Sequence, residues 1–228
     1  MKIAVLGTGM VGQSLTAALL ARGHFVVIGT RDVATTLAAV EPDTFGAPGF
    51  ALWYRRYSHV PVVRFADAIA QCDVLINATR ATSILDILAR VPRATFEDKV
   101  LIDVSNDLDF SRGLPPILRI TDVAGSSVGE RIQTAFPLTR VVKTLNTMNA
   151  FVMVRPELVS GGDSTVFVSG NDVEAKKLVQ VLLREFGWDD IIDLGDIATA
   201  RTAELLFPLW FKTWGAIGQK PFNFKVAR

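Results

Sequence analysis

Cysteine is nearly absent from this sequence, which contains Cys72 and no other. One cysteine cannot form an internal disulfide, and it excludes a metal site built from several cysteines. Because Cys72 lies just before the apolar run Val74–Ile76, we expect a small buried residue rather than a reactive thiol. The sequence therefore predicts neither a disulfide-stabilised fold nor a metal centre.

The sequence also lacks an excess of charge of either sign. Its 24 lysines and arginines are balanced by 23 aspartates and glutamates, which gives a formal charge of +1. Proteins that attract nucleic acid or acidic membrane surfaces usually carry a basic excess. We therefore expect no nucleic-acid partner.

Long apolar runs are missing as well, since no segment approaches the ~20 apolar residues that span a bilayer. The first apolar strand begins directly after Met1, so we expect no targeting segment before the fold. Together with the scarcity of cysteine, these features predict a soluble cytoplasmic protein with no membrane partner.

Apolar residues are abundant: 50% of the chain is hydrophobic and 21% is charged. Such a composition supports a full core and excludes a disordered chain. A length of 228 residues suits one large domain, or one domain with a small appendage.

The first dozen residues predict a dinucleotide-binding turn. Ile3–Leu6 is continuously apolar, as in a central parallel strand that is covered on both faces. Gly7, Gly9 and Gly12 follow at the G-x-G-x-x-G spacing. In this motif the first glycine permits the tight turn, the second lets a pyrophosphate approach the backbone, and the third lets the helix pack on the strand. The pyrophosphate would bind the N–H groups at the helix N-terminus.

The end of the second expected strand, Phe25–Ile28, favours NADP over NAD. Gly29-Thr30-Arg31-Asp32 follows this strand, at the place where a βαβ unit presents the group that contacts the adenosine ribose. An acidic residue at the strand tip would select the free 2′-hydroxyl of NAD, whereas Thr30 and Arg31 fit a 2′-phosphate. Asp32 lies one or two positions beyond the place where an acidic residue would contact the ribose, and we expect it to cap the following turn.

Strands and helices alternate along the rest of the chain. Further strands are predicted at 62–65, 74–77, 100–103, 140–145, 165–169 and 191–194, with helices between them. The pattern predicts an α/β fold with a doubly wound (Rossmann), mostly parallel sheet. We place an NADP-binding Rossmann domain at residues 1–150. Residues 151–228 form a small C-terminal α/β extension, strand–helix–strand–helix, packed on that domain in a single globular unit.

Three segments stand out from this alternation. Residues 41–61 are the least regular and include a short helix at Phe50–Tyr57 in an inserted loop, and residues 107–116 form a loop marked by proline and glycine. The last helix, about residues 199–216, is strongly apolar and should be kinked at Pro208. Because apolar helices often form subunit contacts and most soluble oligomers are two-fold dimers, we expect a homodimer.

The loops expected around a nicotinamide ring are poor in acid–base groups. Ala78–Ala81, Ser105–Asn106 and Asn146–Ala150 follow the carboxyl ends of strands, and they offer amides, hydroxyls and small side chains but no histidine. Lys143 is nearby but lies inside a strand. Neither tyrosine is followed by lysine four residues later, so the general acid of the short-chain dehydrogenases is missing.

Hydride transfer between two redox cofactors needs no acid–base residue from the protein, which supplies position and excludes water. The sequence therefore favours an NADP-dependent oxidoreductase whose second substrate is a deazaflavin or a flavin. No residue is assigned to proton transfer, and Asn146 and Thr147 are the candidates for positioning the hydride.

A set of motifs spread over nearly the whole chain carries a resemblance to a known family. The motifs are Gly7–Gly12, Gly29–Arg31, Leu101–Asn106, Val141–Asn146, Val166–Asn171, Asp193–Gly195 and Phe222–Lys225. In these motifs the chain resembles the NADPH:coenzyme F-420 oxidoreductases and their bacterial homologues. It is also similar to the cytoplasmic reductase domain of the STEAP metalloreductases, without their membrane-spanning haem part.

The resemblance implies NADP(H) as cofactor, and coenzyme F-420 or FMN/FAD as the second substrate. The NADP contacts it implies are Thr8, Gly9, Met10, Val11, Thr30, Arg31, Ala78 and Thr79, with Asn106 and Ala150 close by. We add Gly7 and Gly12 of the glycine motif, and Asn146, as further candidate NADP-binding residues. The chain departs from the family at two places. The family often has a second basic residue where this chain has Asp32, and some archaeal deazaflavin enzymes have histidine where this chain has Asn146.

Two other functions stay open. A non-catalytic NADP-binding or redox-sensing protein would share the same lack of catalytic residues. A reductase of a small carbonyl or imine ranks last, because the related dehydrogenases carry an added all-helical domain and a catalytic lysine or aspartate.

Overall fold

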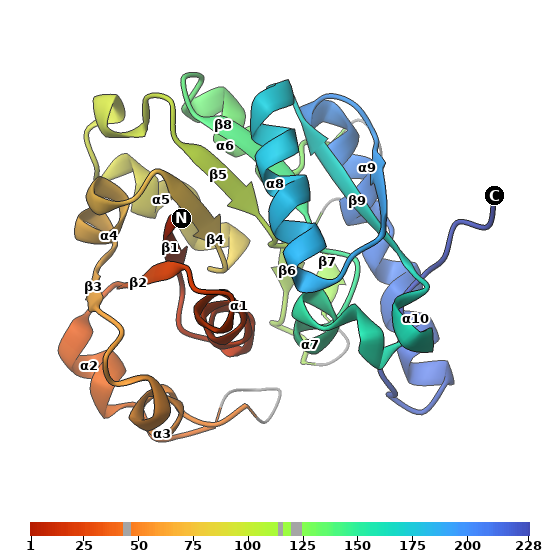
Figure 1. Ribbon diagram of the computed structural model, residues 1–228, viewed down its shortest axis with the longest axis horizontal. Coiled ribbons are helices and arrows are strands. Elements are labelled where there is room, and N and C mark those ends of the chain that lie inside the picture. The colour runs from red at the N-terminus through yellow and green to blue at the C-terminus, as the bar shows by residue number, and fades with distance from the viewer. Residues whose placement is uncertain (43–46, 114–115, 120–124) are drawn as a thin grey trace.

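The computed structural model describes residues 1–42, 47–113, 116–119 and 125–228 (Figure 1). The expected irregular segments 41–61 and 107–116 each include positions outside the described residues, at 43–46 and 114–115 respectively.

Eight strands form one sheet in the order β10-β9-β8-β5-β4-β1-β2-β3. Neighbouring strands are parallel, except that β9 is antiparallel to β8. The strands of this sheet are β1 (Lys2–Leu6), β2 (Phe25–Thr30), β3 (Val62–Arg64), β4 (Val74–Asn77), β5 (Val100–Asp103), β8 (Arg140–Thr144), β9 (Thr165–Gly170) and β10 (Asp190–Asp193).

Helices cover both faces of the sheet. The α-helices are α1 (Met10–Ala21), α2 (Val33–Ala38), α3 (Phe50–Tyr54), α4 (Phe65–Gln71), α5 (Ala81–Ala89), α6 (Val128–Ala135), α7 (Ala150–Val154), α8 (Val173–Phe186), α9 (Ala200–Leu205) and α10 (Phe207–Ala216). Side chains of α1, α7 and α8 share one core cluster with the sheet, and those of α4, α5, α6 and α9 share another. Figure 1 shows α8 lying in front of β8 and β9.

The two clusters explain why the first strand is continuously apolar. Ile3 and Val5 belong to the cluster on one face, and Ala4 and Leu6 to the cluster on the other. A strand buried on both faces needs apolar side chains at every position, so alternation disappears. The doubly wound, mostly parallel fold predicted from the sequence is confirmed.

The C-terminal extension is continuous with the sheet, because β9 pairs directly with β8 and β10 pairs with β9. A division of the chain near residue 150 stays a prediction.

The helix between β9 and β10, α8, is capped at its C-terminus by Gly187, which has a φ of +102°. The expected kink in the last helix is confirmed: α9 and α10 are separate helices, and Pro208 lies in the first turn of α10.

The prediction that residues 107–116 form only a loop is wrong. The first part of this segment contains β6 (Leu108–Asp109), which pairs antiparallel with β7 (Ile117–Leu118) in a second, two-stranded sheet. Strands of two residues carry too little periodicity to be recognised in a sequence. Elsewhere the expected elements are present, including the short helix that begins at Phe50 and the buried Cys72.

None of the helices within the described residues has the length and apolar character required to cross a membrane.

Candidate functional site

The predicted site residues converge on the edge of the sheet where β1, β2, β4, β5 and β8 end. These strands are parallel, so the segments that follow them lie along one edge. Register brings the ends of the central strands side by side. Leu6 pairs with Asn77, Asn77 with Asp103, and Asp103 with Lys143, the residue before the last one of β8.

The glycine turn leaves no room for larger residues at its first and third glycines. Gly7 has a φ of +121°, and a Cβ there would lie 2.5 Å from the carbonyl oxygen of Ala78. A Cβ on Gly12 would lie 2.2 Å from the carbonyl oxygen of Gly7. The turn therefore needs glycine at both positions, for the backbone conformation and for close packing of α1.

Gly9 is different, because nothing in the folded chain requires it to be glycine. Its φ of −77° and ψ of −174° are open to any residue, and a Cβ there would have no atom within 4 Å among the described residues. Gly9 is also the N-cap of α1, and α1 has neither a capping side chain nor an acidic residue in its first turn. An open space at an uncapped helix N-terminus fits a pyrophosphate that approaches the backbone.

At the tip of β2, Thr30 is 5% exposed, and its hydroxyl oxygen lies 2.6 Å from that of Thr36. Arg31 follows and is exposed. The expected role of Asp32 is confirmed: it is the N-cap of α2, and its side chain accepts a hydrogen bond from the N–H of Thr35 at 2.7 Å. Hydrogen bonds from Thr35, with a smaller contribution from the charge of Arg64, hold the pKa of Asp32 below its ordinary value.

Two side-chain amides set the conformation of the loops beyond β4 and β5. Asn77 donates to Asp103 at 2.8 Å, and its own oxygen accepts from the hydroxyl of Thr79 at 2.7 Å. Asn106 donates to the backbone oxygen of Asn146 at 2.8 Å. Ala78 and Thr79 are half-buried. They lie next to the glycine turn, because the backbone of Ala78 packs closely against Gly7.

Asn146 and Thr147 are almost completely buried, at 3% and 2% exposure. The side-chain amide of Asn146 donates to Asn106 at 3.0 Å and to the backbone oxygen of Ala203 at 3.1 Å. Asn146 thus joins the loops after β5 and β8 to helix α9. Ala150, the first residue of α7, is 4% exposed. The roles of these residues toward a cofactor stay predictions.

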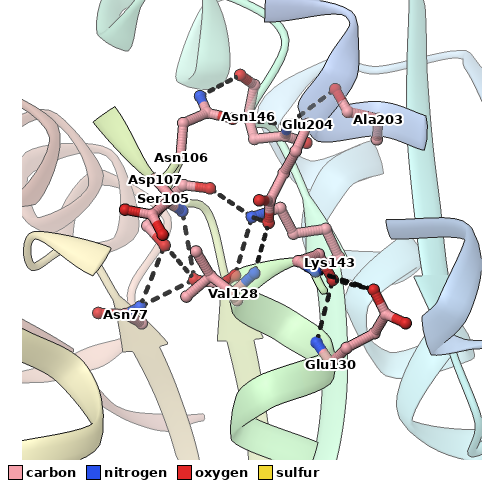
Figure 2. A network of polar contacts seen from close by, with 12 residues as sticks. Asn77, Ser105, Asn106, Asp107, Val128, Glu130, Lys143, Asn146, Ala203 and Glu204 are labelled. Carbon is pink, nitrogen blue, oxygen red and sulfur yellow. Dashed lines mark hydrogen bonds and ion pairs between the residues drawn. The ribbon is translucent and has the colours of Figure 1, made fainter. Parts of the chain in front are cut away.

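A buried ion network that the sequence did not reveal lies beside these loops (Figure 2). The ε-ammonium of Lys143 is 2.8 Å from a carboxylate oxygen of Asp103 and 2.7 Å from one of Glu204, and it also donates to the backbone oxygen of Ser105. The side chain of Lys143 is 1% exposed, and those of Asp103 and Glu204 are 0% exposed. The backbone N–H of Val128 donates to Glu204 at 3.0 Å.

The network sets two carboxyl groups, Asp103 and Glu204, against one ammonium group, Lys143. Burial alone would lower the pKa of Lys143, but the charges of Asp103 and Glu204 outweigh burial and raise it. Burial raises the pKa of Glu204, and the attraction of Lys143 only partly opposes that effect. One oxygen of Glu204, Oε2, is buried and has no partner among the described residues. We conclude that Lys143 is charged and serves to hold the two acids rather than to transfer protons.

One signal in the sequence pointed to part of this network. Asp103 ends the apolar strand β5, and Lys143 follows Val141 and Val142 inside β8, where an isolated buried charge would be costly. Their pairing depends on strand register, and Glu204 comes from a helix far along the chain, so the full network requires the structure.

The histidines and Tyr54 lie away from this edge. The chain's two histidines, His24 and His59, precede β2 and β3 and therefore lie near the opposite, amino-terminal ends of the strands. His24 is engaged there, with Nε2 at 2.7 Å from Glu185. Tyr54 lies in α3, where its hydroxyl donates to the backbone of Val60 at 2.8 Å. Over the described part of the chain, no group of three or more histidine, cysteine or acidic side chains could hold a metal ion.

Comparisons with known proteins agree with this geometry. Residues 2–107 match the family model described as NADP oxidoreductase, coenzyme F-420-dependent. A solved structure from Arthrobacter sp. FB24, described as a candidate F-420-dependent NADP-reductase, is 50% identical with a TM-score of 0.93, and the alignment covers 100% of both chains.

Two curated proteins are more distant relatives. The F-420-dependent NADP reductase of Methanocaldococcus jannaschii is 27% identical over 92% of this chain and 90% of its own length. The human metalloreductase STEAP2 is 29% identical over 91% of this chain, but the chain spans only 37% of its length.

Proposed function

The chain belongs to the family of coenzyme F-420-dependent NADP oxidoreductases, and from this premise we propose that it transfers hydride between NADP(H) and a deazaflavin of the F-420 type. That it is an NADP-dependent oxidoreductase follows from the family. The deazaflavin as second substrate is the further step.

The observation that carries the proposal is the composition of the carboxyl edge of the sheet. Among the described residues this edge combines an open, uncapped helix N-terminus at Gly9 with loops of amides, hydroxyls and small side chains. Lys143, the lysine near this edge, is buried and forms ion pairs with Asp103 and Glu204. Such a site can position two rings and exclude water. Its carboxyl group of raised pKa, Glu204, is 0% exposed and is paired with Lys143 rather than open to a substrate.

Each part of the site has a separate role in this proposal. Gly7, Gly9 and Gly12, with the N–H groups of Thr8, Met10 and Val11, receive the pyrophosphate. Thr30 and Arg31 receive the 2′-phosphate, and Arg31 does so by charge-assisted hydrogen bonds. When bound, NADPH supplies the hydride.

The loops hold the nicotinamide ring. Ala78, Thr79 and Ala150 flank the ring. Asn106 and Asn146, which bond to each other, fix the distance between the loops after β5 and β8. Asn146 and Thr147 then act by positioning, because both are buried and the amide of Asn146 is already committed to Asn106 and Ala203.

An acceptor assay tests the proposal. We expect the purified protein to oxidise NADPH in the presence of coenzyme F-420, with lower turnover or none when FMN or FAD replaces it. NADH in place of NADPH is the matched control and should support much slower reduction, because it lacks the 2′-phosphate. Absorbance of F-420 and of NADPH, recorded together, checks that the two change in equal amounts.

Three outcomes would change the assignment. Turnover with FMN or FAD but not with F-420 would replace the deazaflavin by a flavin. Tight NADPH binding without turnover of any of the three would favour a non-catalytic NADP-binding protein. Equal rates with NADH would contradict the role of Thr30 and Arg31. The homodimer and the cytoplasmic location stay predictions.

A further inference from the structure

A second arginine lies at the tip of β2 although it comes from another strand. Arg64 is the last residue of β3 and pairs with Thr30, the last residue of β2, in a parallel register. Paired residues of neighbouring strands point to the same face, about 4.8 Å apart across the sheet. Arg64 therefore lies at the same corner of the carboxyl edge as Thr30 and Arg31.

Both arginines at this corner are available for a ligand. Arg31 and Arg64 are exposed, and within the described ranges neither guanidinium makes a hydrogen bond or an ion pair. Arg119 and Arg131, in contrast, are both paired with Asp107. Two unpaired cations at one corner predict an anionic ligand.

The negative charge of Asp32 affects how many cations are needed to bind a phosphate at this corner. Its carboxylate caps α2 and lies close enough to Arg64 for the two charges to interact. With Arg31 alone, the negative charge of Asp32 would cancel the local positive charge and oppose a phosphate dianion. With Arg64 added, the corner keeps a net positive charge.

We propose that Arg64 is a second cation for the 2′-phosphate of NADP, acting from the end of β3 beside Thr30 and Arg31. The inference rests on the proposed 2′-phosphate site at Thr30 and Arg31. In this inference, residues at the ends of both β2 and β3 contribute to the selection of NADP over NAD.

Calorimetric titration with adenosine 2′,5′-bisphosphate and with adenosine 5′-monophosphate tests the inference without any hydride acceptor. We expect Arg64→Ala to weaken binding of the bisphosphate by about five- to twentyfold and binding of the monophosphate by less than about twofold. Arg31→Ala should show the same selectivity with at least as large a loss. Arg64→Lys should retain part of the affinity, because it keeps the charge but not the planar fork.

Arg90→Ala is the matched control, because it removes an exposed arginine from the far end of α5. It should leave both affinities unchanged, and all variants should melt at the temperature of the unmodified protein. Unchanged bisphosphate affinity in Arg64→Ala, or an equal loss for both nucleotides, would overturn the role of Arg64.

The test separates this inference from the function it rests on. If the unmodified protein binds the two nucleotides equally, the 2′-phosphate site itself is contradicted. If it discriminates between them but Arg64→Ala discriminates equally well, only Arg64 is excluded. Failure of the protein to reduce F-420 would leave the binding result standing.

Discussion

Replacing Lys143 with methionine is expected to lower the free energy of unfolding by about 3–5 kcal/mol, the range measured when one partner of a buried ion pair is removed. The side chain of Lys143 is 1% exposed and donates to Asp103, Glu204 and the backbone oxygen of Ser105. Methionine fills a similar volume but leaves two carboxyl groups buried without a cation. Urea denaturation of the two proteins at equal pH measures the difference.

Lys177→Met is the matched control. Lys177 forms an ion pair of nearly the same length, 2.9 Å, with Glu174, but the two side chains are 64% and 73% exposed. Removing an exposed pair changes stability by less than about 0.5–1 kcal/mol. Equal losses in the two variants would contradict the view that Lys143 neutralises a buried acidic pair.

The loss of unfolding free energy caused by Lys143→Met should also depend on pH. Burial raises the pKa of Glu204 above its ordinary value even with Lys143 present, and loss of the lysine removes the attraction that opposes this rise. A carboxyl group whose pKa is higher in the folded protein lowers the stability as pH rises above its unfolded-state pKa, and the loss is complete above its folded-state pKa. Because the substitution should raise the folded-state pKa of Glu204 further, the deficit relative to the unmodified protein should shrink as pH falls from neutral toward the ordinary pKa range of carboxyl groups.

The second large effect is expected at the glycine turn. Gly12→Ala should lower the free energy of unfolding by roughly 3 kcal/mol or more, because its Cβ would lie 2.2 Å from the carbonyl oxygen of Gly7 and only the backbone can yield. Thermal melting without ligand measures this loss. We expect α1 to be displaced from β1, so NADPH binding should fail as well.

Gly9→Ala separates ligand binding from folding at the same turn. Its Cβ would meet no atom within 4 Å, and its backbone conformation suits alanine, so the variant should melt within a few degrees of the unmodified protein. If the pyrophosphate lies against Gly9, the added methyl group should weaken NADPH binding at least tenfold, or about 1.4 kcal/mol. Normal NADPH affinity in Gly9→Ala would show that the pyrophosphate lies elsewhere.

Features that depend on neighbouring residues were predictable from the sequence. The glycine turn, the N-cap at Asp32 and the break near Pro208 each follow from residue types a few positions apart. The doubly wound fold followed from apolar strands that alternate with helices. The small sheet of β6 and β7 did not, because two-residue strands leave no pattern.

Features that depend on strand order required the structure. Lys143 could be seen inside a strand, but its partner Asp103 follows from the register of β5 and β8, and Glu204 from the packing of α9. Arg64 approaches Thr30 only because β3 lies beside β2. The commitment of the Asn146 amide to Ala203 likewise joins loops that are distant in sequence. Sequence patterns located the glycine turn, whereas the contacts of the loops after β5 and β8 depend on tertiary structure.

Deuterium transfer from NADPH to coenzyme F-420 is the most direct test of the proposed function. NADPH labelled at either of the two hydrogens of nicotinamide C4 would be mixed with the protein and F-420 in ordinary water, and the reduced F-420 analysed by mass spectrometry. If the site only holds two rings against each other, one labelled form should deliver its deuterium to F-420 without loss to the solvent. No transfer from either form, or deuterium that appears in the water, would contradict direct hydride transfer at this site.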